Sequence, residues 1–237
     1  MNRRAFIKVL ALGTAAMYVS GCDSASSDVS SNANDKMQTA DATSPVNQPE
    51  QSSVSGGNNM KIVVINGSPH SETQSTSKYL AQRFIEGATT RGHEIFKFDA
   101  ANEETHPCKG CDHCHMDGDC IFKDAIEMKL MSKMLEADVL VLVTPLYYFG
   151  MSAQLKIVVD RFYSRTTRLS GKKSLLIATA WNSADWTMEA LKNHYETLVR
   201  YMDWEDIGQV LATGCGTRSM VERSEFGDIA YRIGAGL

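Results

Sequence analysis

The sequence lacks a cluster of basic side chains, and its charges nearly balance. Its 24 lysines and arginines are slightly outnumbered by 28 aspartates and glutamates, which gives a formal net charge of −4. Binding to nucleic acid depends on clustered positive charge, so this composition argues against nucleic acid as a partner. Cysteine is also scarce, with six in the whole chain. Four of them lie in the single stretch from His106 to Cys120, and this concentration calls for a chemical explanation.

The first 22 residues lack an apolar run long enough to span a membrane. Arg3 and Arg4 precede an uncharged run from Val9 to Gly21, which is shorter than the ~20 apolar residues of a spanning helix. This build is typical of an export signal. The segment NRRAFIK resembles the twin-arginine signal pattern, and VSGC resembles the lipobox before a lipidated cysteine. We predict a lipoprotein signal at 1–22 with lipidation at Cys22, and an uncleaved membrane anchor is the alternative.

Residues 23–59 lack aromatic side chains altogether and are dominated by small and polar residues. Such a segment cannot bury a hydrophobic core, so we predict a disordered tether. The lipidated tether would hold the following domain at the cell envelope, on the outer side of the cytoplasmic membrane. In a Gram-negative cell this is the periplasmic side. The resemblance to a twin-arginine signal implies export of a folded, cofactor-loaded protein, which indicates a redox function.

Residues 60–237 alternate between β-branched runs and amphipathic helical patterns, which predicts one α/β domain. Its fold is expected to be a doubly wound five-stranded parallel sheet, with strands at 61–65, 93–100, 138–145, 173–180 and 207–214. The intervening helices are expected at 75–92, 122–135, 154–162 and 186–202, with a last one near Ile229 and Ile233. Sheets of this kind bind ligands at the carboxyl ends of their strands, so the loops there are the candidate sites.

The loop after the first strand, NGSPHSETQSTS, is rich in hydroxyl side chains and leads into a helix. Hydroxyls, free backbone N–H groups and the positive end of the helix dipole together can hold a phosphate. The loop lacks both the Walker lysine and the three-glycine dinucleotide fingerprint, which argues against a nucleoside triphosphate. A simple helix cap is the alternative.

The loop after the third strand, PLYYFG, offers flat apolar walls, and its glycine lets backbone approach a ring closely. Aromatic residues after a strand are also common in simple packing. The neighbouring phosphate loop favours the ligand-binding interpretation.

The cysteines after the second strand have the spacing C-x2-C-x2-C-x5-C. Disulfides are permitted in an exported protein, but cysteines so close together would close strained loops. Zinc usually takes two separated pairs of ligands, and ferredoxin clusters often take a remote fourth cysteine. Their place after a strand predicts that the cysteines lie toward the same edge of the sheet as the phosphate loop. The residues alone leave an iron–sulfur cluster, zinc, disulfides and free thiols open.

These loops carry a resemblance to a known family. GSPHSETQS and TPLYYFGMSAQLKIVVDR resemble the phosphate loop and the flavin-ring loop of the flavodoxin-like FMN reductases, and YMDWEDIGQVLATG resembles their last strand. The resemblance covers essentially all of 60–237, and the compact cysteine pattern resembles that of the iron–sulfur flavoproteins. The sequence departs from the family pattern at two places. His70 lies where arginine is common in the family, and the loop AWNSADW after the fourth strand lacks the glycines that are usual there.

The resemblance implies a set of cofactor-binding residues. The FMN phosphate would meet Ser68, His70, Gln74, Ser75 and Thr76, and the isoalloxazine would lie against Pro145, Leu146, Tyr147, Tyr148, Phe149 and Gly150. The far side of the ring would meet Ala180, Trp181 and Asn182. A [4Fe–4S] cluster would be bound by Cys108, Cys111, Cys114 and Cys120.

The resulting expectation is an exported FMN-dependent oxidoreductase that passes electrons between flavin, a cysteine-ligated cluster and a redox partner or quinone. NAD(P)H is a possible donor, and the resemblance implies a homo-oligomer. The alternatives are an electron carrier without a substrate of its own, an NAD(P)H-dependent FMN or quinone reductase without a cluster, and an interaction domain without flavin. No pair of acid and base residues identifies a catalytic proton-transfer site in the sequence.

Overall fold

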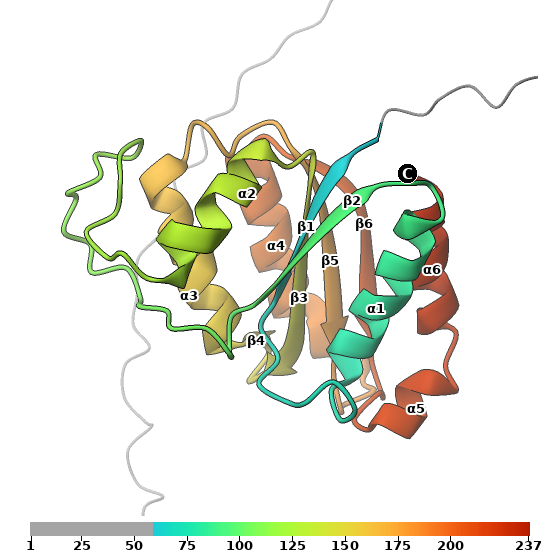
Figure 1. Ribbon diagram of the computed structural model, residues 1–237. Coiled ribbons are helices and arrows are strands. Elements are labelled where there is room, and N and C mark those ends of the chain that lie inside the picture. The colour runs from blue at the N-terminus through green and yellow to red at the C-terminus, as the bar shows by residue number, and fades with distance from the viewer. Residues whose placement is uncertain (1–58) are drawn as a thin grey trace, which may run out of the picture. The chain divides into compact units, whose positions relative to one another are not determined.

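The computed structural model describes residues 59–237, shown as a ribbon in Figure 1. The predicted signal, the lipidation site Cys22 and the predicted tether lie outside the described residues, so they stay predictions. None of the helices in the described part of the chain is long and apolar enough to cross a membrane.

The described domain is built around one sheet with the strand order β2-β1-β3-β5-β6. Its strands are β1 (Lys61–Asn66), β2 (Glu94–Asp99), β3 (Val139–Tyr147), β5 (Lys173–Thr179) and β6 (Glu205–Ala212), all parallel to their neighbours. A short strand, β4 (Gly150–Met151), adds an antiparallel hairpin to the end of β3. The order reverses between β1 and β3, which is the ligand-binding switch point of the flavodoxin-like arrangement. The predicted five parallel strands are confirmed, and β4 is an addition.

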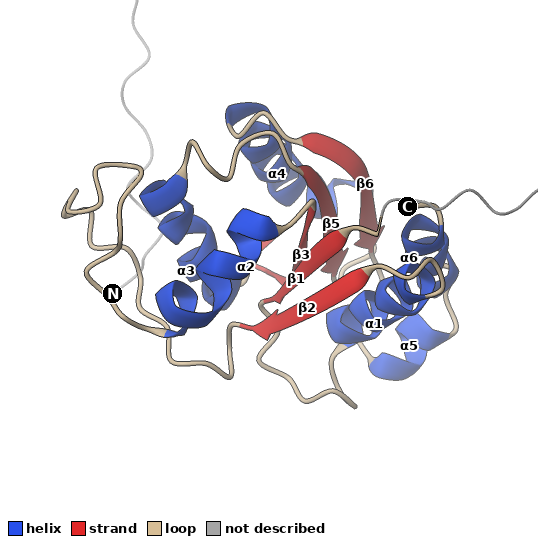
Figure 2. Cartoon of the chain, turned by 45° about the horizontal axis from the view of Figure 1, so that its top comes forward, coloured by secondary structure: helices blue, strands red, loops and turns tan. Residues whose placement is uncertain are grey.

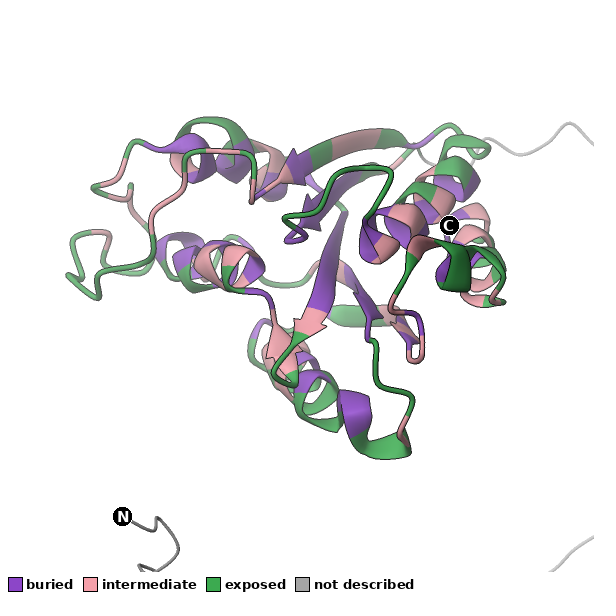
Figure 3. Cartoon of the chain, turned by 90° about the horizontal axis from the view of Figure 1, so that it is seen from below, coloured by how far each residue is buried: buried purple, intermediate pink, exposed green. Residues whose placement is uncertain are grey.

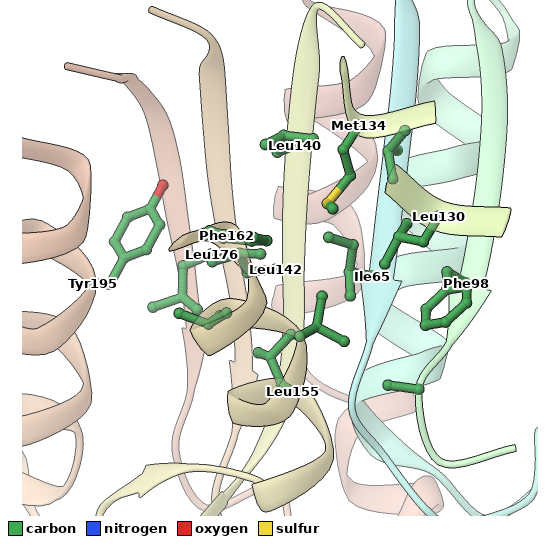
Figure 4. Close-up of a cluster of buried hydrophobic side chains, with 14 of the residues drawn as sticks. Ile65, Phe98, Leu130, Met134, Leu140, Leu142, Leu155, Phe162, Leu176 and Tyr195 are labelled. Carbon is green, nitrogen blue, oxygen red and sulfur yellow. The ribbon is translucent and has the colours of Figure 1, made fainter. Parts of the chain in front are cut away.

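Helices cover both faces of the sheet (Figures 1 and 2). α1 (Thr76–Thr89) and α6 (Phe226–Ala235) lie on one face, and α2 (Met131–Glu136), α3 (Ala153–Arg161) and α4 (Glu189–Tyr201) lie on the other. A short helix, α5 (Arg218–Glu222), precedes α6. Because side chains alternate along a strand, Val63 and Ile65 of β1 join one core cluster while Ile62 and Val64 join the other. Figure 4 shows the first cluster between the sheet and α2, α3 and α4.

Two of the predicted helices begin with a turn that is not α-helical. The helix expected from Phe122 starts with a π-helical turn, η1 (Ile126–Leu130), and continues as α2. Phe122 lies outside it, because its ring stacks on His106 with the ring centroids 4.7 Å apart. The helix expected from Trp186 begins as a 3₁₀ turn, η3 (Asp185–Met188), before α4. A second 3₁₀ turn, η2 (Phe162–Arg165), extends α3.

Candidate functional site

A cavity of about 530 Å³ opens at the carboxyl edge of the parallel strands, where the loops are partly exposed (Figure 3). This volume lies in the usual range for a small-molecule site. The carboxyl end of β3 and the loops after β1, β5 and β6 contribute its walls. Its lining residues are Ser68, His70, Thr73, Gln74, Ser75, Thr76, Pro145, Leu146, Tyr147, Thr179, Ala180, Trp181, Cys215, Gly216, Thr217 and Arg218. The cavity therefore sits at the switch point of the sheet.

The start of α1 supplies one end of this cavity with hydrogen-bond donors. Ser75 caps α1 by accepting a bond of 3.1 Å from the Lys78 N–H, and its hydroxyl donates to Ser68 Oγ at 2.8 Å. Ser68 Oγ also accepts from the His70 N–H at 3.4 Å. Because Ser68 Oγ already accepts two hydrogen bonds, the Ser68 hydroxyl remains available as a donor. Together with the free N–H groups of the first helical turn, this end of the cavity favours an anion such as phosphate.

Polar contacts behind the loop hold it in place. Asn66 accepts the Ser68 N–H at 3.2 Å and donates to Asp99 at 2.7 Å. The buried Lys78 ammonium lies 3.6 Å from Asp99. On the other side, Ser152, which caps α3, donates its hydroxyl to the Gly67 carbonyl at 2.8 Å. The loop is thus fixed to β2, to α1 and to the start of α3 without a ligand.

The hairpin between β3 and β4 forms the rim of the cavity. Tyr148 and Phe149 at its tip have φ angles of 45° and 64°, in the left-handed region that bulky residues rarely adopt. Such strain is most common at functional sites. The Tyr148 side chain is fully exposed, and the Phe149 ring lies 5.1 Å from that of Trp186. The hairpin therefore presents aromatic rings to solvent beside the cavity.

The opposite wall comes from the loops after β5 and β6. The Trp181 ring lies flat against Gly216, where an added Cβ would come within 1.9 Å of the ring. Arg218 donates to the Glu72 carbonyl at 2.8 Å and lies over the Tyr79 ring at 4.5 Å. Burial raises the pKa of the Cys215 thiol, so this thiol stays protonated at neutral pH. Arg218 brings a positive charge to the cavity, which is partly offset because its Nε pairs with Glu222 at 2.7 Å.

The segment that carries the four clustered cysteines, residues 106–123, is called the cysteine loop below. Cys108, Cys111, Cys114 and Cys120 line one small pocket together, and all four are free thiols in the described structure. The Gly110 N–H lies 3.4 Å from the Cys108 sulfur as a donor. Three non-glycine residues of the loop, Asp112, His115 and Met116, have positive φ. Among the described residues, no group of three or more possible ligands is already gathered tightly enough to hold a metal ion.

The cysteine loop does not stay at the edge of the sheet where the cavity opens. It turns back beside α3, away from the sheet (Figures 1 and 2), and its pocket is completed by Arg161, Tyr163 and Ser164 at the end of that helix. The Thr166 N–H donates to the Met116 carbonyl at 3.0 Å. The prediction that the cysteines lie at the same edge as the phosphate loop is therefore wrong. The cysteine pocket lies at the carboxyl end of α3, whereas the phosphate loop contacts Ser152 at the start of that helix.

Arg161 joins the base of the cysteine loop to α3. Its guanidinium pairs with Asp124 at 2.8 Å, and both side chains are almost completely buried. Asp160, the neighbour of Arg161 in the sequence, pairs with Lys156. Burial tends to raise the pKa of Asp124, but hydrogen bonds from Arg161 and from two backbone N–H groups lower it overall.

Comparison with known proteins agrees with this geometry. Residues 60–210 match the sequence profile of the family described as NADPH-dependent FMN reductase. The chain belongs to this family. The predicted flavodoxin-like FMN reductase resemblance is thereby confirmed, and the match supports an FMN-dependent oxidoreductase as the class of enzyme.

Curated relatives of the family include iron–sulfur flavoproteins. The chain is 36% identical over 110 residues to the iron-sulfur flavoprotein MJ1083 of Methanocaldococcus jannaschii, covering 46% of this chain and 54% of the relative. It is 37% identical over 110 residues to an iron-sulfur flavoprotein of Archaeoglobus fulgidus, covering 46% and 51%. The aligned part of the chain thus spans about half the length of these relatives. A putative NAD(P)H-dependent FMN-containing oxidoreductase of Bacillus subtilis, YwqN, is 27% identical over 167 residues, covering 65% and 86%.

Solved structures share the fold. An NAD(P)H:quinone oxidoreductase from Methanothermobacter marburgensis superposes with a TM-score of 0.60 at 17% identity, covering 75% of this chain and 96% of that one. An azoreductase from Bacillus anthracis gives a TM-score of 0.60 at 15% identity, covering 75% and 100%. At these identities the likeness shows the fold alone.

Most residues predicted to meet FMN line the cavity at the switch point. Those that do are Ser68, His70, Gln74, Ser75, Thr76, Pro145, Leu146, Tyr147, Ala180 and Trp181. Tyr148, Phe149 and Gly150 form the hairpin tip and do not line it. Asn182 is also outside, because its side chain accepts the Ala184 N–H at 3.1 Å and its carbonyl accepts from Gly214.

The residues from Cys215 to Arg218 line the pocket but were not predicted to do so. The signal that could have found them is the sequence TGCGT directly after the last strand, where a parallel sheet of this family places ligands. Their contribution includes the positive charge of Arg218, at a site where His70 replaces a common arginine. The donor-rich end, the flat walls and this charge fit FMN.

Proposed function

We propose that this protein is an FMN-dependent oxidoreductase that works at the cell envelope. The observation that carries the proposal is the cavity at the switch point, with an anion-favouring end at the start of α1 and flat walls from the neighbouring loops. Bound FMN would supply an acceptor for one or two electrons. The family match supports this class of enzyme, and the reaction of the whole protein is part of the proposal.

The chain's own residues would bind and orient the cofactor. Ser68 would donate its remaining hydrogen to a phosphate oxygen, and the first turn of α1 would add backbone donors and the helix dipole. Arg218 would balance the phosphate charge in place of the common arginine at the position of His70. Pro145, Tyr147 and Trp181 would lie against the ring system and keep water from its faces.

The first test is the identity and the affinity of the flavin. Extraction of purified protein should release FMN and not FAD, because one phosphate-binding end is present. Ser68→Ala should weaken FMN binding by about 1.5–3 kcal/mol, or about ten- to hundredfold in Kd, since it removes a hydrogen bond to a charged group. Titration with FMN, followed by flavin fluorescence, measures this. Ser183→Ala is the control, because Ser183 is an exposed serine at the same edge but outside the cavity. Extraction of FAD, or equal Kd values for Ser68→Ala and Ser183→Ala, would contradict the proposal.

The cysteine loop supports a second part of the proposal, a [4Fe–4S] cluster held by Cys108, Cys111, Cys114 and Cys120. Four free thiols line one pocket, and thiolates are the ligands that such clusters require. The names of the curated relatives point the same way. Zinc on the same thiols and a loop without metal are the alternatives.

The electron donor is proposed to be a membrane quinol or a neighbouring redox protein, because an exported protein meets little NAD(P)H. The family description favours a second candidate, NADPH as the donor. Stopped-flow reduction of the flavin by NADPH and by a quinol distinguishes them. Rapid reduction by NADPH with no response to quinols would assign the second candidate.

Lipidation at Cys22 and export by the twin-arginine route complete the proposal, and both rest on residues outside the described part of the chain. Cys22→Ala should leave the precursor uncleaved, because the lipoprotein peptidase acts only at a lipidated cysteine. Mass spectrometry and membrane fractionation measure this. As a control, Cys215→Ala should be lipidated and cleaved normally. A diacylglyceryl mature form of Cys22→Ala would disprove the lipobox assignment.

A further inference from the structure

Two buried arginines, one helical turn apart at the end of α3, hold the two arms of the cysteine loop. Arg161 contacts the start and the end of the loop, and Arg165 contacts the arm that leaves it. Arg165 donates to the Gly118 and Ser164 carbonyls, pairs with Asp119, and pairs with Glu127 at 3.1 Å. Both arginines are at least nine-tenths buried, which is rare for this residue type unless it is paired.

Arg161 makes a dense set of contacts with the two ends of the cysteine loop. One of its terminal nitrogens donates to the His106 carbonyl at 3.1 Å and to Asp124 at 2.8 Å, and the other donates to Asp124 at 3.3 Å. Asp124 in turn accepts the His106 N–H at 2.8 Å. The guanidinium also lies 5.5 Å from the centroid of the Phe122 ring, which stacks on His106. Arg161 therefore fixes both the start and the end of the cysteine loop.

One donor of Arg161 is left over. Its Nε–H is buried and has no hydrogen-bond partner within the described residues, although the side chain is only 1% exposed. A buried donor without a partner is energetically unfavourable and calls for an explanation. Arg161 lines the pocket of the four cysteines, where the acceptors are the sulfur atoms together with the side-chain oxygens of Asp112, Asp160, Tyr163 and Ser164. Arg165 also has an unpaired Nε–H, but Arg165 does not line that pocket.

We propose that Arg161 is the positioning residue of the cysteine site. It holds the cysteine loop closed through His106 and Asp124, and its Nε–H donates to a sulfur atom of the loaded pocket. The second part rests on the proposed cluster, whereas the first concerns the protein without metal. Hydrogen bonds to sulfur and a nearby positive charge both stabilise the more negative, reduced form of a cluster. Arg161 therefore raises the reduction potential of this site.

The first experiment uses the full chain without metal and follows hydrogen exchange of residues 106–123. Arg161→Lys keeps the positive charge but loses the planar guanidinium that bonds both His106 and Asp124. Amide hydrogens of the cysteine loop should therefore exchange at least tenfold faster. Lys156→Gln is the matched control, because it breaks an exposed ion pair on the same helix. Unchanged hydrogen exchange of the cysteine loop in Arg161→Lys would disprove that Arg161 holds the loop closed.

Folding is checked separately. Arg161→Lys leaves Asp124 with a charged partner, and a double variant, Arg161→Met with Asp124→Leu, leaves no unpaired buried charge. The double variant should retain FMN and the far-ultraviolet circular dichroism of the parent, while its cysteine loop exchanges as fast as that of Arg161→Lys. Slow hydrogen exchange of the cysteine loop in this folded double variant would also disprove that Arg161 holds the loop closed.

The second experiment uses anaerobically reconstituted protein and measures the reduction potential from the paramagnetic signal of the reduced cluster. Arg161→Lys should shift the ratio of reduced to oxidised cluster by about tenfold toward the oxidised form, which is 59 mV more negative for one electron. Arg165→Lys, which loosens the loop without facing the pocket, should shift it much less. Equal shifts in the two variants, or none, would overturn sulfur donation by Arg161. If the parent protein takes up no iron, both the proposed cluster and the hydrogen bond from Arg161 to its sulfur are disproved. The exchange experiment still tests whether Arg161 holds the cysteine loop closed.

Discussion

Replacing Gly67 by alanine should release the flavin from an otherwise folded protein. A Cβ at Gly67 would lie 2.4 Å from Ser152 Oγ and 2.7 Å from Leu155 Cβ, distances that real Cβ atoms do not reach. The phosphate loop and the start of α3 meet at this point, where Ser152 donates to the Gly67 carbonyl. The added methyl group must push these two segments apart. Overpacking of this kind costs about 1–3 kcal/mol, and we expect the loss to fall on the position of Ser68 and hence on FMN affinity.

Gly150→Ala is the matched control for this experiment. Gly150 lies in the hairpin beside the cavity, and its added Cβ would meet its first neighbour, the Tyr147 carbonyl oxygen, only at 3.9 Å. Fluorescence titration should therefore give nearly the parent Kd for Gly150→Ala and a Kd at least tenfold higher for Gly67→Ala. Thermal unfolding checks that Gly67→Ala is still folded. Parent-like affinity in Gly67→Ala would show that the loop after β1 does not hold the phosphate.

The sheet could be predicted because its strands are buried on both faces. Runs such as Val139–Val143 are continuously apolar, and Gly92 and Asn66–Gly67 mark where elements end. The start of α2 could not be predicted from the same pattern. Phe122 has helical spacing with Ile126, but its ring packs on His106, a contact that the local sequence does not encode.

The candidate site was predictable where one loop supplies several residues, as in the stretch from Ser68 to Thr76. It was not predictable where the support comes from distant strands. Asn66 reaches Asp99 on β2, and Arg218, which is 146 residues further along the chain, donates to the Glu72 carbonyl. The place of the cysteine loop is of the same kind, because contacts with the end of α3 draw it away from the edge of the sheet.

The second large effect is expected from Cys111→Ser, which should remove the cluster and leave the flavin. Anaerobically reconstituted parent protein should contain about four irons and about four sulfides per chain, with a paramagnetic signal after reduction. A serine hydroxyl is a harder and far less acidic ligand than a thiol, so the cluster should lose its iron and its signal. The flavin pocket shares no lining residue with the cysteine pocket among the described residues, and FMN content should stay at the parent level.

Cys215→Ser is the matched control, because it makes the same substitution at a buried thiol of the flavin pocket. It should keep the iron, the sulfide and the paramagnetic signal, and any loss should appear in FMN affinity. Cys111→Ser should therefore lose iron but keep FMN, and Cys215→Ser should keep iron. A general loss of stability would not separate the two cofactors in this way. Iron and sulfide assays, metal analysis and flavin extraction on the same samples measure all of these quantities. Zinc in the parent protein, or no metal after reconstitution, would refute the cluster and leave a flavoprotein whose cysteine loop serves another purpose.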